Sequence, residues 1–241
     1  MSIISVVTTR SLCKSKLTLI TTLALLLSAC NDNDGPTVMT PEPAEYSYTV
    51  TVTNLTYAQP LSPLGIILHS DSKMWLVGDA ASLALEKLAE SGDNIDFLAE
   101  SNALATSSGA GVILPGTAST VEISTTDRMA TYFTAATMLV NTNDAFSGLT
   151  GIDISTIAVD GKKSWNLNVY DAGTELNSEA MGTIPGPADG GTGFDASRDD
   201  VDFVGYHSGV VSQDDGLSSS VLTQAHRFDN PAIKLTITRT K

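Results

Sequence analysis

The sequence predicts an all-β fold, an antiparallel β-sandwich with one or two short helices. Several segments alternate apolar and polar residues with a period of two, as half-buried strands do. Turn-forming residues separate these segments at short intervals. Only one segment, Asp79–Ser91, has the apolar spacing of an amphipathic helix. Short strands, frequent turns and little helix favour two packed antiparallel sheets.

The expected strands are rich in β-branched and aromatic residues. Tyr46–Thr53 shows the clearest alternation, and Gly65–His69 is a short apolar run. Six further strands are expected at Ser119–Thr125, Arg128–Val140, Thr150–Val159, Ser164–Tyr170, Asp202–Tyr206 and Ile233–Thr240. In the one helix, Asp79 is expected to cap the start and Gly92 to end it, with Leu85 and Leu88 on the buried face.

Residues 1–29 have the pattern of a signal peptide that ends in a lipobox. An uncharged apolar run, Leu17–Leu27, is too short to span a bilayer, which takes about 20 residues. The run leads into Leu27-Ser-Ala-Cys30, so Cys30 is the expected site of lipidation. A short transmembrane anchor and an ordinary cleaved signal are the alternatives. Three basic residues precede the run: Arg10, Lys14 and Lys16.

Residues 30–45 are expected to be a flexible tether between the lipidated Cys30 and a domain at residues 46–241. The segment is polar, contains proline and has no apolar period. Its Asn31–Gly35 stretch is similar to the start of a calcium loop, but the remaining EF-hand spacing is absent. Cys30 would anchor the chain to a membrane of the cell envelope. Asn31, where inner-membrane lipoproteins often carry Asp, favours the outer membrane, on either of its faces.

The acidic composition bears on possible partners. The net charge is −14, and removing the three basic residues of the signal peptide would make it −17. Such a surface repels nucleic acid and anionic lipid headgroups and suits divalent cations or cationic partners. Cys13 and Cys30 are the only cysteines, so the mature domain is expected to fold without a disulfide, as a monomer.

Motifs of catalysis are weak in this sequence. Gly205–Gly209 is similar to a nucleophile elbow, but Ser208 stands one place late; a strand end with a glycine turn is the simpler interpretation. The three histidines lack zinc-site spacing. Gly109 and Gly111 lack the context of a nucleotide-binding loop. Residues 181–202 predict a long loop rich in Gly, Pro and Asp, a kind of loop that is often functional.

Two carboxylate-rich segments follow expected strands. Asn141–Asp144 and Asp171–Glu175 offer carboxylate and amide oxygens at strand ends, and calcium takes six to eight oxygen ligands. Loops cluster at one end of a sandwich, so the two segments could converge on one ion. Solvated acidic loops are the alternative in a chain this acidic.

Several of these segments together resemble the spondin domain, the N-terminal module of F-spondin and mindin. The resembling motifs occur in order from Tyr46 to Thr240: Thr51–Thr56, Pro60–Pro63, His69, Trp75–Gly78, Leu88–Gly92, Asp127–Arg128, Met138–Val140, Asp144–Gly148, Asp171–Glu175 and Asn230–Ala232. The resemblance implies a C2-like β-sandwich with a calcium ion between the loops at one end.

The resemblance also implies the metal ligands. Asp144 and Asp171 match the family's aspartates, a backbone carbonyl is expected near Val140, and Glu175 stands at the last acid of the Asp-Ala-Gly-Thr motif. The sequence departs from the family at Thr125, where a glutamate ligand is expected. Asp127 and Glu122 are the acids that could replace it.

Three functions follow from these features. The leading expectation is a surface-tethered, non-catalytic binding or adhesion module for a protein or glycan ligand, possessing a calcium site; the animal relatives act in extracellular matrix and adhesion. The second is a hydrolase of envelope or extracellular polymers that uses paired carboxylates. The third is a structural lipoprotein that packs into a larger envelope assembly.

Overall fold

The computed structural model describes residues 42–70 and 73–241. The predicted signal peptide, Cys30 and most of the tether therefore lie outside the described residues. No helix in the described ranges has the length and apolar character needed to cross a membrane. The strands are β1 Tyr46–Asn54, β2 Gly65–His69, β3 Ala103–Ser108, β4 Ala118–Thr125, β5 Tyr132–Met138, β6 Ala145–Asp153, β7 Lys162–Leu167, β8 Val169–Asp171, β9 Gly205–Tyr206 and β10 Ile233–Arg239.

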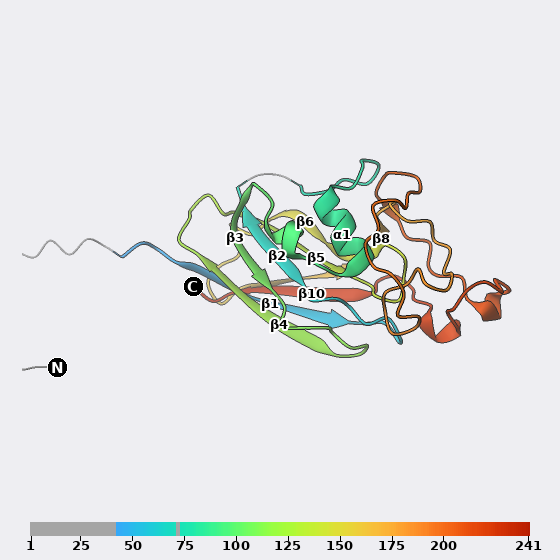
Figure 1. Ribbon diagram of the computed structural model, residues 1–241. Helices are drawn as coiled ribbons and strands as arrows, with labels where there is room; N and C mark the ends of the chain where they lie inside the picture. The colour runs from blue at the N-terminus through green and yellow to red at the C-terminus, as the bar shows by residue number, and fades with distance from the viewer. Residues whose placement is uncertain (1–41, 71–72) are drawn as a thin grey trace, which may run out of the picture. The chain divides into compact units, whose positions relative to one another are not determined.

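The strands form two antiparallel sheets that pack face to face (Figure 1). One sheet has four strands in the order β4-β1-β10-β7, and the other has six in the order β3-β2-β5-β6-β8-β9. Every strand pair is antiparallel. The predicted all-β sandwich is therefore confirmed.

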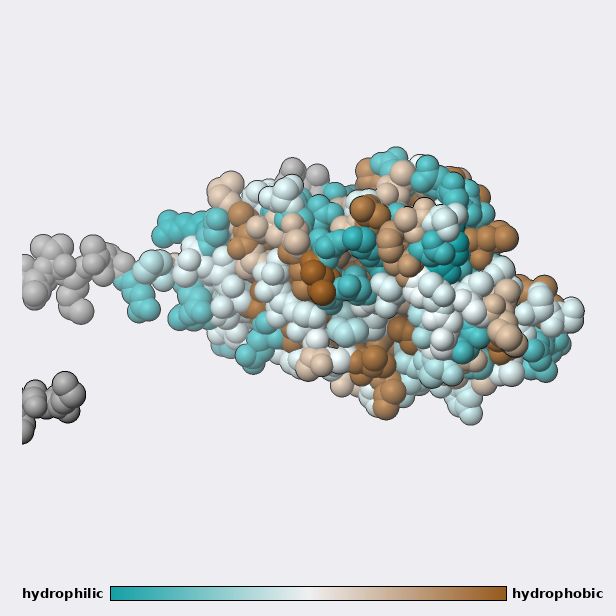
Figure 2. Space-filling view, in the orientation of Figure 1, coloured by the Kyte–Doolittle hydropathy of each residue, from teal (hydrophilic) through white to brown (hydrophobic). Residues whose placement is uncertain are grey.

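The core between the sheets explains the period-two pattern. In β1, Tyr48, Val50 and Val52 point inward and are buried, and their neighbours on the outer face are serine and threonine. Burial of alternate β-branched residues is what holds two sheets together. The space-filling view shows apolar residues in several small groups rather than in one large patch (Figure 2).

Two short helices, α1 Leu83–Ser91 and α2 Ile95–Leu98, cover part of the outer face of the six-stranded sheet. Leu85 and Leu88 pack there as predicted, and Gly92 ends α1 with a left-handed φ of 71°. The predicted start was wrong. Ser82, not Asp79, caps the helix, because the Ser82 hydroxyl accepts a hydrogen bond from the backbone N–H of Leu85 at 3.2 Å.

Four of the eight predicted strands are confirmed closely. β1, β2, β4 and β10 lie within one residue of their expected bounds. β5 and β9 are shorter than expected. The strand expected at Ser164–Tyr170 is divided between β7 and β8, which belong to different sheets. β6 starts five residues before Thr150, and β3 was not expected. Residues 181–202 contain neither helix nor strand, as predicted.

The two ends of β1 define the two ends of the sandwich. At its first residue, Tyr46 pairs with Thr125 of β4. At its last residue, the Asn54 side chain donates to the carbonyl of Gln59 at 2.8 Å. The Gln59 side chain in turn donates to the carbonyl of Asn141 at 3.1 Å, in the loop that precedes Asp144. The Asp144 loop therefore lies at the end of the sandwich away from Tyr46.

Candidate functional site

Asp144 lies at the centre of the candidate site, immediately before β6. Its side chain is fully buried. One carboxylate oxygen, Oδ2, accepts hydrogen bonds from the backbone N–H groups of Thr174 at 2.9 Å and Glu175 at 3.1 Å. The pKa of Asp144 is raised to about 7, chiefly because the side chain is buried and secondly because the charge of Asp171 is nearby. The residue after Asp144, Ala145, pairs with Asp171 of β8. The structure thus brings the two predicted aspartates together.

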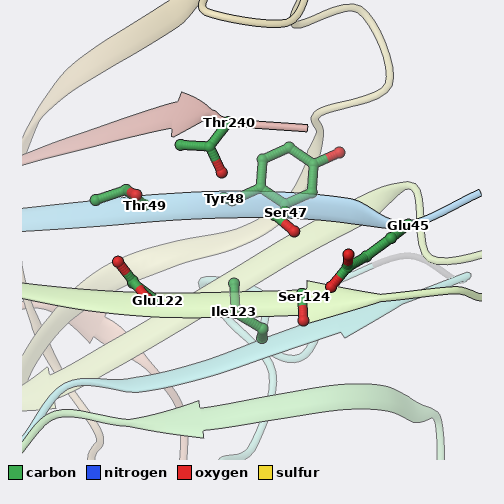
Figure 3. Close-up of a pocket in the computed structure, with 8 residues that line it drawn as sticks. All are labelled: Glu45, Ser47, Tyr48, Thr49, Glu122, Ile123, Ser124 and Thr240. Atoms are coloured by element: carbon green, nitrogen blue, oxygen red, sulfur yellow. The ribbon is translucent and has the colours of Figure 1, made fainter.

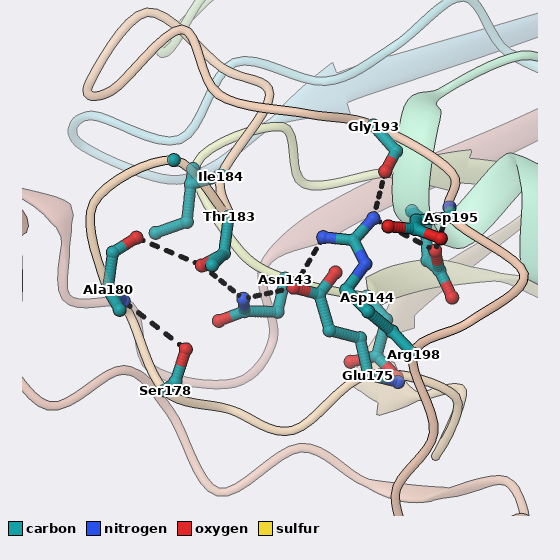
Figure 4. A network of polar contacts seen from close by, with 12 residues as sticks. Asn143, Asp144, Glu175, Ser178, Ala180, Thr183, Ile184, Gly193, Asp195 and Arg198 are labelled. Carbon is teal, nitrogen blue, oxygen red and sulfur yellow. Dashed lines mark hydrogen bonds and ion pairs between the residues drawn. The ribbon is translucent and has the colours of Figure 1, made fainter.

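Glu175 belongs to a buried ionic network beside Asp144 (Figure 4). Its Oε1 accepts hydrogen bonds from Asn143 at 2.9 Å and from the guanidinium of Arg198 at 2.7 Å. The other guanidinium arm reaches Oε2 of Glu90 at 3.3 Å and also donates to the carbonyl of Gly193. Arg198 therefore joins the long loop to α1 and to the turn after β8.

The network contains more negative charge than its one arginine can neutralise. Asp144, Glu175 and Glu90 are all buried, and burial raises the pKa of Glu175 to about 7 and that of Glu90 above its ordinary value. One oxygen of each carboxyl group is buried without a hydrogen-bond partner among the described residues: Asp144 Oδ1, Glu175 Oε2 and Glu90 Oε1. Buried polar atoms normally have partners, so these oxygens require protons or a cation.

The arrangement of side chains limits which groups could serve as ligands of a metal ion. No group of three or more His, Cys, Asp or Glu side chains within residues 42–70 and 73–241 is arranged to hold a metal ion. A calcium ion at Asp144 and Asp171 would therefore take its other ligands from backbone carbonyls, amide side chains or water, which calcium accepts. The buried, unpartnered Oδ1 of Asp144 is the observation that fits such an ion.

Asp171 is also held by a second chain of polar contacts. Its Oδ1 accepts the backbone N–H of Gly173 at 2.8 Å, and its Oδ2 accepts the side-chain amide of Asn177. The carbonyl oxygen of that amide lies 3.1 Å from Nε2 of His207, whose Nδ1 accepts the N–H of Gly209 at 3.0 Å. Because Nδ1 accepts a hydrogen bond, the proton of the neutral His207 ring lies on Nε2, which donates to Asn177. The carboxylate is thus fixed in orientation at the sandwich end.

The carbonyl of Val140 faces the long loop. A methyl group added at Gly186 would lie 2.2 Å from the Val140 carbonyl oxygen, so only glycine permits this close approach. The Asn141 side chain makes a parallel contact, because its Oδ1 accepts the N–H of Ala188 at 3.0 Å. The long loop is therefore packed onto the segment that leads into Asp144.

The structure places Thr125, where the resemblance implies a glutamate ligand, far from the other expected ligands. Thr125 pairs with Tyr46, at the opposite end of the sandwich from Asp144. The seven residues of β5 separate the two ends, about 20 Å at the usual rise of a strand. Glu122 lies on the outer face of β4 in a shallow hollow that Glu45 also lines (Figure 3). Asp127 follows β4 at the Tyr46 end. A side chain at any of these positions cannot share an ion with Asp144.

The segment similar to a nucleophile elbow and the histidines occupy separate parts of the fold. Residues 207–212, directly after β9, form no helix; Gly209 instead adopts a φ of 93°, as expected for a strand end with a glycine turn. His69 is buried within β2, and its Nε2 lies 2.9 Å from the Thr134 hydroxyl. His226 belongs to a short 3₁₀ turn, Gln224–His226. The three histidines therefore lie at separate places, and His207 reaches Asp171 through the Asn177 side chain.

Two residues of the network, Glu90 and Arg198, were not predicted from the sequence. Glu90 adjoins the apolar face of α1, where a charge is unusual. Arg198 is the one basic residue in the acidic segment 181–202. An isolated arginine in a long acidic loop is the signal that could have revealed a buried ion pair, although not its partners.

No protein-family model matches this chain, and no curated protein matches it significantly. The resemblance to spondin domains therefore rests on short motifs alone, two of which, Asp144–Gly148 and Asp171–Glu175, lie side by side in the fold.

Proposed function

We propose that this protein is a surface-tethered, non-catalytic binding or adhesion module, and that a calcium ion held by Asp144 and Asp171 stabilises its loop end. The observation that carries the proposal is the burial of the acidic side chains: Asp144 is 0% exposed and Glu175 is 3% exposed. Acids placed in this way support the fold rather than touch a large substrate.

The same burial argues against the alternative of a polymer hydrolase. Such an enzyme places two carboxyl groups across a scissile bond, about 5 Å or 6.5–9.5 Å apart, in contact with the substrate. One oxygen of Asp144 accepts two backbone N–H groups, and one oxygen of Glu175 accepts hydrogen bonds from Arg198 and Asn143. Both carboxyl groups are buried, which disfavours contact with a polymer chain.

The candidate site and the start of the domain lie at opposite ends of the sandwich. The predicted tether joins the domain at Tyr46, and Asp144 lies at the other end of the sandwich. β1 has nine residues, so the acidic end lies on the order of 25 Å from Tyr46 along the strand. A hollow of about 330 Å³ lies at this end of the sandwich, and Glu175 and Arg198 line it.

Thermal unfolding of the full-length chain tests the calcium ion. Calcium that binds only the folded state adds RT ln(1 + [L]/Kd), about 2.7 kcal/mol at a hundredfold excess over Kd. We expect millimolar calcium, but not magnesium, to raise the Tm relative to chelator. Asp144→Ala and Asp171→Ala should abolish the shift, while Asp127→Ala, at the opposite end, should preserve it. A wild-type Tm that is equal in calcium and chelator would contradict the site.

A cell-aggregation assay tests the adhesive function. Cells that display the wild-type chain should aggregate more than cells without it, and chelator should reverse the effect. Asp144→Asn removes the charge but keeps the shape of the side chain, so displayed Asp144→Asn should not promote aggregation. Release of soluble products from an envelope polymer by wild type, lost in Asp144→Asn, would instead establish the hydrolase.

A further inference from the structure

We infer that an aromatic groove on the six-stranded sheet binds the sugar rings of a neutral glycan. The inference rests on the proposed binding function and places its ligand away from the acidic end. The groove has a volume of about 340 Å³, within the range of small-ligand pockets. Trp75, Tyr170 and Tyr206 line it, together with Lys73 and Thr150.

A chain of rings fixes the groove in place. Phe146 is fully buried and stacks on Tyr170 at a centroid distance of 5.4 Å, and Tyr170 stacks on Tyr206 at 5.3 Å. Trp75 packs edge-on against Phe146 at 5.3 Å and against Tyr170 at 6.2 Å. The outermost ring, Tyr206, belongs to the edge strand β9 and is 63% exposed. An exposed ring that stacks on the half-buried Tyr170 loses little entropy when a ligand binds.

The composition of the lining selects the ligand. Sugar rings with equatorial substituents have faces of C–H groups that pack on aromatic rings, while their hydroxyls need polar partners at the edge. Lys73 supplies an ammonium donor at this edge. Leu76 and Val77, which are 45% and 50% exposed, add apolar surface to the lining.

Charge decides between neutral and charged ligands. Aromatic cages bind quaternary ammonium groups, but here Lys73 lines the groove and no carboxylate does, so a cation would be repelled. A long anionic polysaccharide would meet the repulsion of a chain with a net charge of −14. A neutral glycan experiences neither penalty.

The groove walls are tied to the sheet by backbone hydrogen bonds. Gly78 donates to the carbonyl of Val204, and Val204 donates to the carbonyl of Asp79, both at 2.8 Å. The Thr150 hydroxyl accepts the N–H of Met74 at 2.6 Å. These contacts connect the Trp75–Val77 wall to β6 and to the residue two before Tyr206. The binding surface is therefore formed before a ligand arrives.

Affinity electrophoresis of the full-length chain tests the inference, in a detergent without a sugar headgroup. The gels contain hydroxyethylcellulose, which is neutral, or carboxymethylcellulose, which has the same backbone and is anionic. We expect the neutral polymer to retard wild type. Tyr206→Ala should weaken the apparent affinity at least tenfold, whereas Tyr206→Phe, which keeps the ring, should stay within about threefold. Tyr57→Ala is the matched control, because Tyr57 is 82% exposed and lies outside the groove.

Three outcomes would overturn the inference: no retardation of wild type by the neutral polymer, equal retardation of wild type and Tyr206→Ala, or stronger retardation by the anionic polymer. The Tm of Tyr206→Ala should match wild type and so exclude misfolding. A chain that promotes calcium-dependent aggregation but is not retarded would overturn the glycan assignment while the proposed adhesive function stands.

Discussion

The guanidinium of Arg198 lies 2.7 Å from Oε1 of Glu175, and this ion pair fastens the long loop to the end of the sandwich. The side chain of Arg198 is only 19% exposed and that of Glu175 only 3%. The same arginine reaches Glu90 on α1. One cation thus connects three segments that are distant in the sequence.

We predict that Arg198→Met lowers the free energy of unfolding by about 3–5 kcal/mol, because it leaves two buried carboxyl groups without their cation. Urea unfolding provides the measurement. Arg227→Met is the matched control. Arg227 pairs with Asp215 at 2.6 Å but is 51% exposed, so its loss should cost less than about 1 kcal/mol. Equal losses of unfolding free energy in the two variants would show that the buried ion pairs of Arg198 stabilise the fold no more than the exposed pair of Arg227.

A second prediction concerns the turn between Asp171 and Glu175. Gly173 has a φ of 72°, and a methyl group there would lie 2.2 Å from the carbonyl oxygen of Phe203. Gly182 also has a positive φ, 86°, but has open space around it. Gly182→Ala should cost about 1–2 kcal/mol, the usual penalty of a left-handed conformation. Gly173→Ala should lower the free energy of unfolding, measured with denaturant, by distinctly more. A smaller loss in Gly173→Ala than in Gly182→Ala would contradict the packing of Phe203 on this turn.

Asp215 provides a pH prediction. The backbone N–H and hydroxyl of Ser212, with smaller contributions from Gln224 and Arg227, lower the pKa of Asp215 to about 2. Its folded-state pKa lies below its unfolded value of about 3.9, so its stabilisation is present above pH 4 and disappears as the pH falls toward 2. The difference in unfolding free energy between wild type and Asp215→Asn should be constant from pH 5 upward and shrink toward pH 2. A difference that does not change between pH 2 and pH 6 would contradict this assignment.

The lipid anchor predicts a simple labelling result. Wild type should incorporate a radiolabelled fatty acid, and Cys30→Ala should not, because the acyl chains have no thiol to attach to. The variant should also accumulate as an uncleaved or mislocalised precursor. Cys13→Ala serves as the control, since Cys13 lies within the predicted signal peptide and should not affect labelling. Equal labelling of wild type and Cys30→Ala would rule out lipidation at this residue.

The fold class and four of the strands could be predicted from the sequence alone. β1 could be predicted because its inward Val50 and Val52 alternate with outward threonines. β6 was displaced in the prediction because its first four residues, Ala145–Gly148, are all buried and show no alternation. The break between β7 and β8 was missed because the period of two continues while the chain crosses from one sheet to the other.

The candidate site shows the same division. The sequence identified Asp144, Asp171 and Glu175 as acids at strand ends, because carboxylates after strands mark loops that can bind cations. Which of these residues meet depends on the pairing of the strands. Antiparallel pairing of β6 with β8 brings Asp144 beside Asp171, and it leaves Thr125 at the other end of the sandwich. Arg198 and Glu90, 108 positions apart, meet because desolvated charges require a partner, and local sequence patterns hold no information on contacts of that range.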